Sequence, residues 1–210
     1  MRTSYIWSKT LWSLVLLIIL YGLSYAFYDK PIDLWMHSHV LETSMLAQIC
    51  MHIAWIFAPK HWLILAVLLA LLGFFLKARR LLFWGTTVVI SMVICFALKT
   101  LLARYRPELL FSDHLYGFHF FSLKHSMNST PSGHAVAAFT GFYAFARLYK
   151  SRGMSIGLII LALLIGVSRI LVTAHYPSDI LFGAYVGVFT VLWCEAFFSK
   201  FFKFKNKKDL

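Results

Sequence analysis

The sequence predicts an all-α integral membrane protein, a six-transmembrane-helix bundle with interfacial helices after the first span. Hydrophobic residues make up 60% of the 210 residues and charged residues only 13%, with a mean hydropathy of +0.75, which excludes an ordinary soluble domain. The apolar residues also gather into six long runs, and a membrane-spanning helix needs about 20 such residues. We therefore expect a single membrane domain over residues 1–210.

The expected spans follow the apolar runs in order. The first run lacks a small-residue cleavage site and continues into the aromatic stretch 25–28, so we interpret it as a retained span and not as a signal peptide. Basic residues separate the second run from the third and the fourth from the fifth. The six spans are expected at about 10–28, 61–76, 81–101, 132–149, 154–172 and 179–199.

The segment 31–60 is harder to assign. Its central part is long and apolar enough for a seventh span, but His37, His39, Glu42 and His52 interrupt it. A seventh span would also weaken the charge asymmetry described next. We expect one or two interfacial helices that begin near Pro31 and end near Pro59, and a re-entrant segment remains an alternative.

Positive charge is distributed unevenly between the two ends of the predicted spans. If the N-terminus is cytoplasmic, 13 of the 20 Lys and Arg residues lie in cytoplasmic segments and 7 lie on the opposite side. The positive-inside rule then places both termini in the cytoplasm. The basic tail 200–210 is expected to contact anionic lipid headgroups and not nucleic acid.

The three cysteines, Cys50, Cys95 and Cys194, lie far apart in apolar runs. They form neither a disulfide framework nor a zinc-binding spacing, and the histidines show no metal-binding spacing either. We expect buried, free thiols and no metal or other cofactor.

Three short motifs place ionisable residues at the edges of the later runs, where such residues are costly and usually functional. Lys99, Arg106 and Arg169 are expected to bind the oxygens of a phosphate, because arginine offers a planar fork and lysine a compact charge. Ser132 and Gly133 begin a predicted helix, whose free N–H groups favour an anion. Residue Arg104 could assist these groups or lie at the surface.

Two histidines complete the set. His175 precedes Asp179 by four residues, and Pro177 between them predicts a turn that brings the carboxylate to the imidazole. Asp179 would keep one ring nitrogen protonated and leave the other free to attack phosphorus, so we predict that His175 is the nucleophile. His134 is then left as the general acid and base.

The same residues carry a family resemblance. Lys99 followed by Arg106-Pro107, the run Pro131–His134, and Ser168-Arg169 with His175 and Asp179 resemble the three-part signature of the type 2 phosphatidic acid phosphatases. The resemblance covers residues 61 to 199, and it implies a metal-independent reaction through a phosphohistidine. It suggests four substrates: undecaprenyl pyrophosphate, phosphatidylglycerophosphate, phosphatidic acid and lipid A phosphates.

We therefore expect a lipid phosphatase of a bacterial inner membrane, with its site on the periplasmic side. Its partners would be a lipid phosphate substrate and the bilayer, with no nucleic acid and no obligate protein partner. A lipid-to-lipid phosphotransferase would use the same histidines. A transporter would also fit six spans, but the charges converge on one face and not on the bilayer midplane.

Overall fold

The computed structural model describes residues 2–40, 44–149 and 152–201, and most of these residues are helical, with the longest loops at one end. Glu42 and most of the predicted basic tail lie outside them. The helices are α1 (Arg2–Leu23), a π-helical turn (Ser24–Tyr28), α2 (Asp29–His39), α3 (Met45–Ile56), α4 (Pro59–Phe75), α5 (Arg79–Leu102), α6 (Pro107–Ser112), a 3₁₀ turn (His125–Met127), α7 (Gly133–Tyr149), α8 (Arg152–Leu171) and α9 (Pro177–Phe201).

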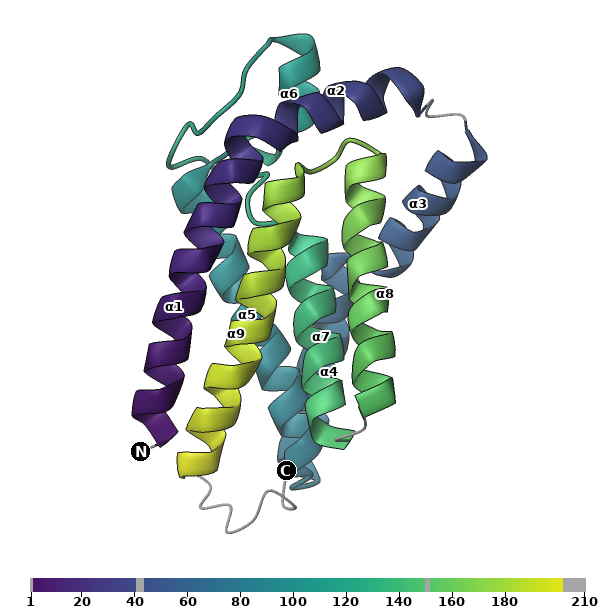
Figure 1. Ribbon diagram of the computed structural model, residues 1–210. Coiled ribbons are helices and arrows are strands. Elements are labelled where there is room, and N and C mark those ends of the chain that lie inside the picture. Colours follow the sequence, from purple (N-terminus) through teal and green to yellow (C-terminus); the bar gives the residue numbers. More distant parts are fainter. Residues whose placement is uncertain (1, 41–43, 150–151, 202–210) are drawn as a thin grey trace.

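The long helices run side by side, as Figure 1 shows, with α1 beginning and α9 ending at the same end of the bundle. At the other end α2 lies across the top, because the π-helical turn 24–28 joins it to α1 without a break and redirects the chain. Helix α3 slants down from there and is followed after a short turn by α4, whose first residue is Pro59. Helix α2 and helix α3 thus occupy the segment 31–60.

Five helical segments are long and apolar enough to cross a membrane, by length and composition: Thr10–His39, Met45–Phe75, Arg79–Leu102, Arg152–Leu171 and Pro177–Phe198. The sequence predicted six. The remaining predicted span, 132–149, corresponds to α7, which has only 17 residues and is mostly buried. Its composition reflects this burial, because alanine and glycine occupy many of its inward positions.

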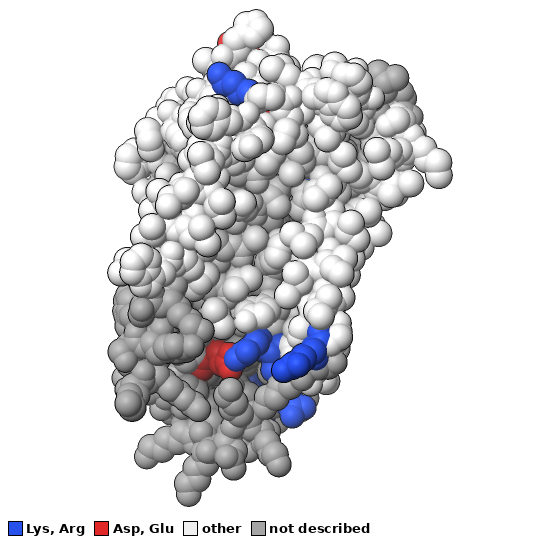
Figure 2. Space-filling model, in the orientation of Figure 1, with Lys and Arg blue, Asp and Glu red and all other residues white. Residues whose placement is uncertain are grey.

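The surface of the bundle is apolar where that of a soluble protein would be polar. Side chains such as Ile18, Leu68 and Leu164 are each about 60% exposed, at 62%, 59% and 58%. Figure 2 shows a broad middle band of this face almost free of charged residues, with lysine and arginine gathered toward its ends. Several ionisable side chains are instead fully buried, and they belong to the candidate site described below.

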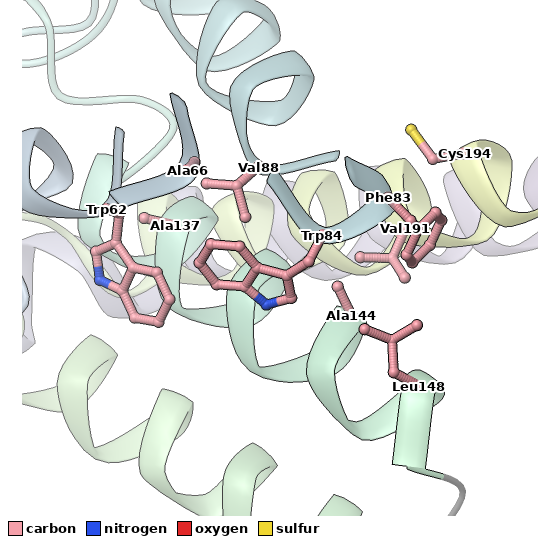
Figure 3. Close-up of a cluster of buried hydrophobic side chains, with 10 residues drawn as sticks. All are labelled: Trp62, Ala66, Phe83, Trp84, Val88, Ala137, Ala144, Leu148, Val191 and Cys194. Carbon is pink, nitrogen blue, oxygen red and sulfur yellow. The ribbon is translucent and has the colours of Figure 1, made fainter. Parts of the chain in front are cut away.

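Helix α7 is the centre of the packing and contacts α4, α5, α8 and α9. Figure 3 shows the cluster where α4 and α5 meet it, around Trp62 and Trp84. The indole N–H of Trp84 donates a 2.9 Å hydrogen bond to the carbonyl oxygen of Gly141. Gly141 has no side chain that would collide with the ring of Trp62.

Helix α9 packs against α7 through two glycines one turn apart. A β-carbon on Gly187 would lie 2.8 Å from Cβ of Phe139 and 2.9 Å from the backbone nitrogen of Thr140. One on Gly183 would lie 2.9 Å from the carbonyl oxygen of Ser132. Small residues with this spacing let helix backbones approach closely in a membrane. The contact holds the beginning of α9 beside that of α7.

We predict that Gly187→Ala destabilises the protein by about 1–3 kcal/mol, because the added methyl group meets backbone that cannot move aside. The control is Gly157→Ala in α8, where an added β-carbon meets nothing within 4 Å. Alanine there should be neutral or stabilising by up to about 1 kcal/mol, since it favours helix over glycine. Unfolding of the purified variants in mixed SDS and non-ionic detergent measures both effects. Equal stability of the two variants would contradict the close α7–α9 contact.

Candidate active site

The three motifs meet at the end of the bundle that α2 crosses. Lys99 lies in the last turn of α5, Arg169 in the last turn of α8 and Asp179 in the first turn of α9. Helix α5 ends at Leu102 and is capped by Ala103, which adopts a left-handed conformation, and Pro107 begins α6 directly after Arg106. The loop residues between them are therefore held at the mouth of the bundle.

The second and third motifs are joined through the backbone. The N–H of Ser132 donates a 3.0 Å hydrogen bond to the carbonyl oxygen of Asp179. Gly133 begins α7, and its missing side chain leaves space for Pro59 and Lys99, whose nearest atoms would lie 3.2 and 3.8 Å from a β-carbon there. These contacts fix the start of α7 against that of α9.

His175 faces Asp179 within the protein interior. Its Nδ1 lies 3.6 Å from Oδ2 of Asp179 and 3.4 Å from the hydroxyl of Ser129. Oδ2 also accepts hydrogen bonds from Ser129 at 2.5 Å and from the backbone N–H of Tyr176 at 3.0 Å. The distance to Asp179 exceeds that of a good hydrogen bond. Nε2 is left as the ring nitrogen that can attack.

The surroundings of His175 favour its neutral form. Burial lowers the pKa of His175 well below its usual value, and the charge of Arg106 lowers it further, whereas Asp179 opposes the shift. Because the folded-state pKa is depressed, the ring stays unprotonated through neutral pH. A neutral imidazole is the form that a nucleophile requires.

Two of the three predicted phosphate-binding cations share a carbonyl group. Nζ of Lys99 donates to the carbonyl oxygen of Asn128 at 2.6 Å, and Nη2 of Arg106 approaches the same oxygen at 3.4 Å. Arg106 also donates to the carbonyl oxygen of Ala174, next to His175, at 3.2 Å. Arg106 thus lies next to His175 in the structure, and the charge of Lys99 is within electrostatic reach of its imidazole.

Other predicted binding groups have unused hydrogen-bonding capacity. The hydroxyl of Ser132 and the Nε of Arg169 are buried and have no hydrogen-bond partner among the described residues. Arg169 lies close enough to Arg106 for the two positive charges to repel each other. Buried donors and like charges in this arrangement are suited to an anion, which would satisfy both.

His134 lies in the first turn of α7, within electrostatic reach of Arg169. Its Nε2 lies 3.0 Å from the carbonyl oxygen of Ala54 in α3. Because a carbonyl oxygen only accepts, Nε2 carries the hydrogen in this contact and Nδ1 is free to exchange a proton. Helix α3 therefore orients a site residue, which the sequence did not predict.

Arg104 is the residue that the sequence left between two positions, beside the phosphate-binding groups or at the surface. The interpretation as a surface residue is wrong, since Arg104 is fully buried. It donates from Nη1 to Oδ1 of Asp179 and from Nη2 to Oδ2 of Asp29, both at 2.7 Å. An arginine fork offers parallel donors to two carboxylates, a geometry that lysine cannot supply.

Aromatic rings surround this guanidinium group. The nearest ring centre lies 4.2 Å from Cζ of Arg104 and the others lie 5.1 to 5.8 Å away, within the range of cation–π attraction. The rings belong to Tyr21, Tyr25, Tyr116, Phe118 and Tyr176. They come from helix α1, the π-helical turn, the loop after α6 and the loop before α9, so Arg104 connects segments far apart in sequence.

The sequence did contain a signal for this cluster. Asp29 and Asp33 stand four residues apart beside an apolar run, and carboxylates in such a place need a partner. Both are fully buried on the inner side of α2. Asp29 is partnered by Arg104, whereas neither carboxylate oxygen of Asp33 has a hydrogen-bond partner in the described part of the chain.

We predict that Arg104→Met lowers the free energy of unfolding by about 3–5 kcal/mol, because it leaves two carboxylates buried without their cation. The matched control is Arg147→Met, which breaks an equally short ion pair with Glu195 whose side chains are 38% and 21% exposed. Because this pair is partly exposed to solvent, its loss should cost less, about 1 kcal/mol. Detergent unfolding of both variants measures the difference. Similar losses would show that burial does not set the energetic importance of the Arg104 cluster.

Comparison with known proteins places this geometry in a family. The PAP2 superfamily model matches residues 80–203. The chain is 36% identical over 108 residues to a lipid A 1-phosphatase of Rhizobium etli and 34% identical over 110 residues to one of Rhizobium johnstonii. These alignments cover 51% and 50% of this chain but 46% and 44% of the relatives, so the chain matches less than half the length of either.

A solved structure shares the fold. The PAP2-type phosphatidylglycerolphosphate phosphatase of Bacillus subtilis superposes with a TM-score of 0.54 at 21% identity, over 90% of this chain and 98% of the other. The family model covers more than half of the chain and includes all three motifs. The resemblance inferred from the motifs is thereby confirmed: this chain belongs to the PAP2 superfamily.

Proposed function

We propose that this protein is an integral membrane phosphatase that removes a terminal phosphate from a lipid phosphate or lipid pyrophosphate. The observation that carries the proposal is a buried imidazole, His175, that faces Asp179 on one side and lies beside Lys99 and Arg106. A neutral nucleophile and fixed cations are what phosphoryl transfer requires when the protein itself supplies the stabilising charge.

The reaction proceeds in two steps. Nε2 of His175 attacks phosphorus and the bond between phosphorus and the lipid oxygen breaks. His134, which in the complex with the anionic substrate carries a second proton on Nδ1, donates that proton to the oxygen as it leaves. Water then attacks the phosphohistidine while His134 takes up its proton, the phosphorus–nitrogen bond breaks and inorganic phosphate departs. Asp179 stabilises the charge that His175 gains during attack. Lys99, Arg106 and Arg169 hold the phosphate oxygens, assisted by Ser132 and the backbone N–H groups that begin with Gly133.

The substrate is a lipid that presents its phosphate at the headgroup level. Relatives named as lipid A 1-phosphatases give lipid A phosphates a place beside undecaprenyl pyrophosphate, phosphatidylglycerophosphate and phosphatidic acid in a panel of four candidates. Phosphate release from each of these purified lipids in detergent tests the function directly. Release of inorganic phosphate without an acceptor lipid supports hydrolysis, whereas transfer of the phosphoryl group onto an acceptor lipid without release of inorganic phosphate supports a phosphotransferase.

We predict that His175→Ala lowers the rate of phosphate release about a thousandfold or more, because a covalent route has no substitute for its nucleophile. His119→Ala, in an exposed position of the loop after α6, is the control and should retain wild-type activity. Asp179→Asn should keep measurable activity, since the imidazole remains. A His175→Ala variant with more than about a tenth of the activity would contradict the mechanism.

Activity should also persist in EDTA, because the cations supply the charge of a divalent metal ion.

The proposed topology has six spans: the five candidate segments and α7, which is included although it has only 17 residues. Helix α7 is shielded by its neighbours, so it needs less apolar length than a helix that contacts lipid on all sides. Helices α2 and α3 then lie at the periplasmic interface of a bacterial inner membrane, and both termini are cytoplasmic. The substrate would enter sideways from the outer leaflet.

Labelling of single cysteines tests this orientation. After replacement of the three buried native cysteines, Ser112→Cys should react with a membrane-impermeant thiol reagent in intact spheroplasts, because Ser112 is exposed beside the site. Gly153→Cys should react only after lysis, since it lies at the other end of the bundle, where an added β-carbon meets nothing within 4 Å. The reverse pattern would move the site to the cytoplasmic leaflet. Labelling of both positions in intact cells would refute the six-span topology.

A further inference from the structure

Asp29 is a buried carboxylate that none of the three motifs includes. It begins α2 and lies outside the region that the family model matches. We infer that Asp29 is a positioning residue for the reaction, acting through Arg104 on Asp179 and thereby on His175. The inference rests on the proposed function and extends the site to the N-terminal helices.

Both oxygens of Asp29 are fully engaged. Oδ1 accepts hydrogen bonds from the hydroxyl of Ser24 at 2.8 Å and the backbone N–H of Ser178 at 3.1 Å. Oδ2 accepts from Arg104 at 2.7 Å and from the hydroxyl of Ser178 at 2.5 Å. A carboxylate with this many donors has one orientation, and it fixes the guanidinium that it contacts.

The fixed guanidinium in turn determines how Asp179 presents its two oxygens. Nη1 of Arg104 binds Oδ1 of Asp179, and the hydroxyl of Thr130 binds the same oxygen. Oδ2 is then the oxygen directed toward Nδ1 of His175. Arg104 also pairs with Asp29, so its positive charge is divided between two carboxylates. Asp179 therefore retains negative charge, which stabilises the imidazolium that forms during attack.

Asp29 does not contact the predicted phosphate-binding groups, and this separates its expected effect from theirs. Its hydrogen bonds within the described part of the chain go to other residues and not to Lys99, Arg106 or Arg169. Loss of its charge should therefore slow the chemical step and leave phosphate binding intact. Such a change lowers kcat with little effect on KM.

The test compares Asp29→Asn with Asp33→Asn. Asp33 lies one turn further along α2, is equally buried and undergoes the same Asp-to-Asn change, but its oxygens have no hydrogen-bond partner among the described residues. Asparagine at position 29 replaces one carboxylate oxygen by an amide N–H₂ group. This group is itself a donor, so it cannot accept the hydrogen bonds that the oxygen accepted. We expect kcat for Asp29→Asn to fall about tenfold to a hundredfold, with KM within about twofold, as for other partners that orient a histidine. Asp33→Asn should retain wild-type kcat.

A structural role would give a different signature. Rapid quenching of a single turnover, with the panel lipid that the wild type hydrolyses fastest, measures both the rate constant and the amplitude of phosphoenzyme formation. Partial unfolding lowers the amplitude and leaves the rate constant unchanged, whereas misplacement of Asp179 lowers the rate constant. A lowered amplitude alone, an unchanged kcat or an equal loss in Asp33→Asn would each overturn the inference.

Two further outcomes are separable. If Asp29→Asn does not accumulate as folded protein, Ser178→Ala removes only a hydroxyl that bonds both Asp29 and Arg104. Its kcat should fall about twofold to tenfold with KM unchanged, and an unchanged kcat would overturn the inference. If the wild-type protein releases no phosphate from any panel lipid, the proposed function fails and the role of Asp29 fails with it. An active wild type with a fully active Asp29→Asn variant refutes the inference alone.

Discussion

The pairing of one guanidinium with two carboxylates in the protein interior is the interaction on which the site depends. Arg104 cannot lose its charge, and neither water nor lipid reaches it. Its position is therefore acceptable only while Asp29 and Asp179 both remain in place, together with the aromatic rings around it. A buried ion pair is weak evidence for stability in itself, but it specifies a unique arrangement because any partial loss is costly. Here that arrangement fixes the carboxylate beside His175.

The motif chemistry was readable from the sequence because each motif lies at the edge of an apolar run. A helix end at the membrane surface is where ionisable side chains are tolerated. Successive spans cross the membrane in opposite directions, so the end of α5, the beginning of α7, the end of α8 and the beginning of α9 lie on the same side. The sequence alone was therefore enough to predict that Lys99, Arg169 and Asp179 lie together, and the family was confirmed. Their roles in catalysis stay predictions until variants are assayed.

The sequence was less informative about segments whose partners are distant. The π-helical turn 24–28 continues α1 into α2, and no local signal distinguishes it from an ordinary helix end. The contact of Ala54 with His134 uses a backbone carbonyl, which every residue has. The sequence left Arg104 between assisting the phosphate-binding groups and lying at the surface, because its partner Asp29 is 75 residues away and only the folded chain shows that the two meet. The span count differed for a related reason, since burial among neighbours relaxes the length and composition required of α7.

The separation of the three charged residues along the chain has a consequence for how the protein is made. Asp29 and Arg104 are both synthesised before Asp179, which lies at the beginning of the last helix. An ion pair can thus form among the earlier helices while α9 has yet to enter the membrane. The incoming helix then brings the second carboxylate to a cation that is already held on its other side. Insertion of the last helix and assembly of the histidine–aspartate pair become a single event, so a chain that stops short of α9 carries the cations of the site without His175 held against Asp179.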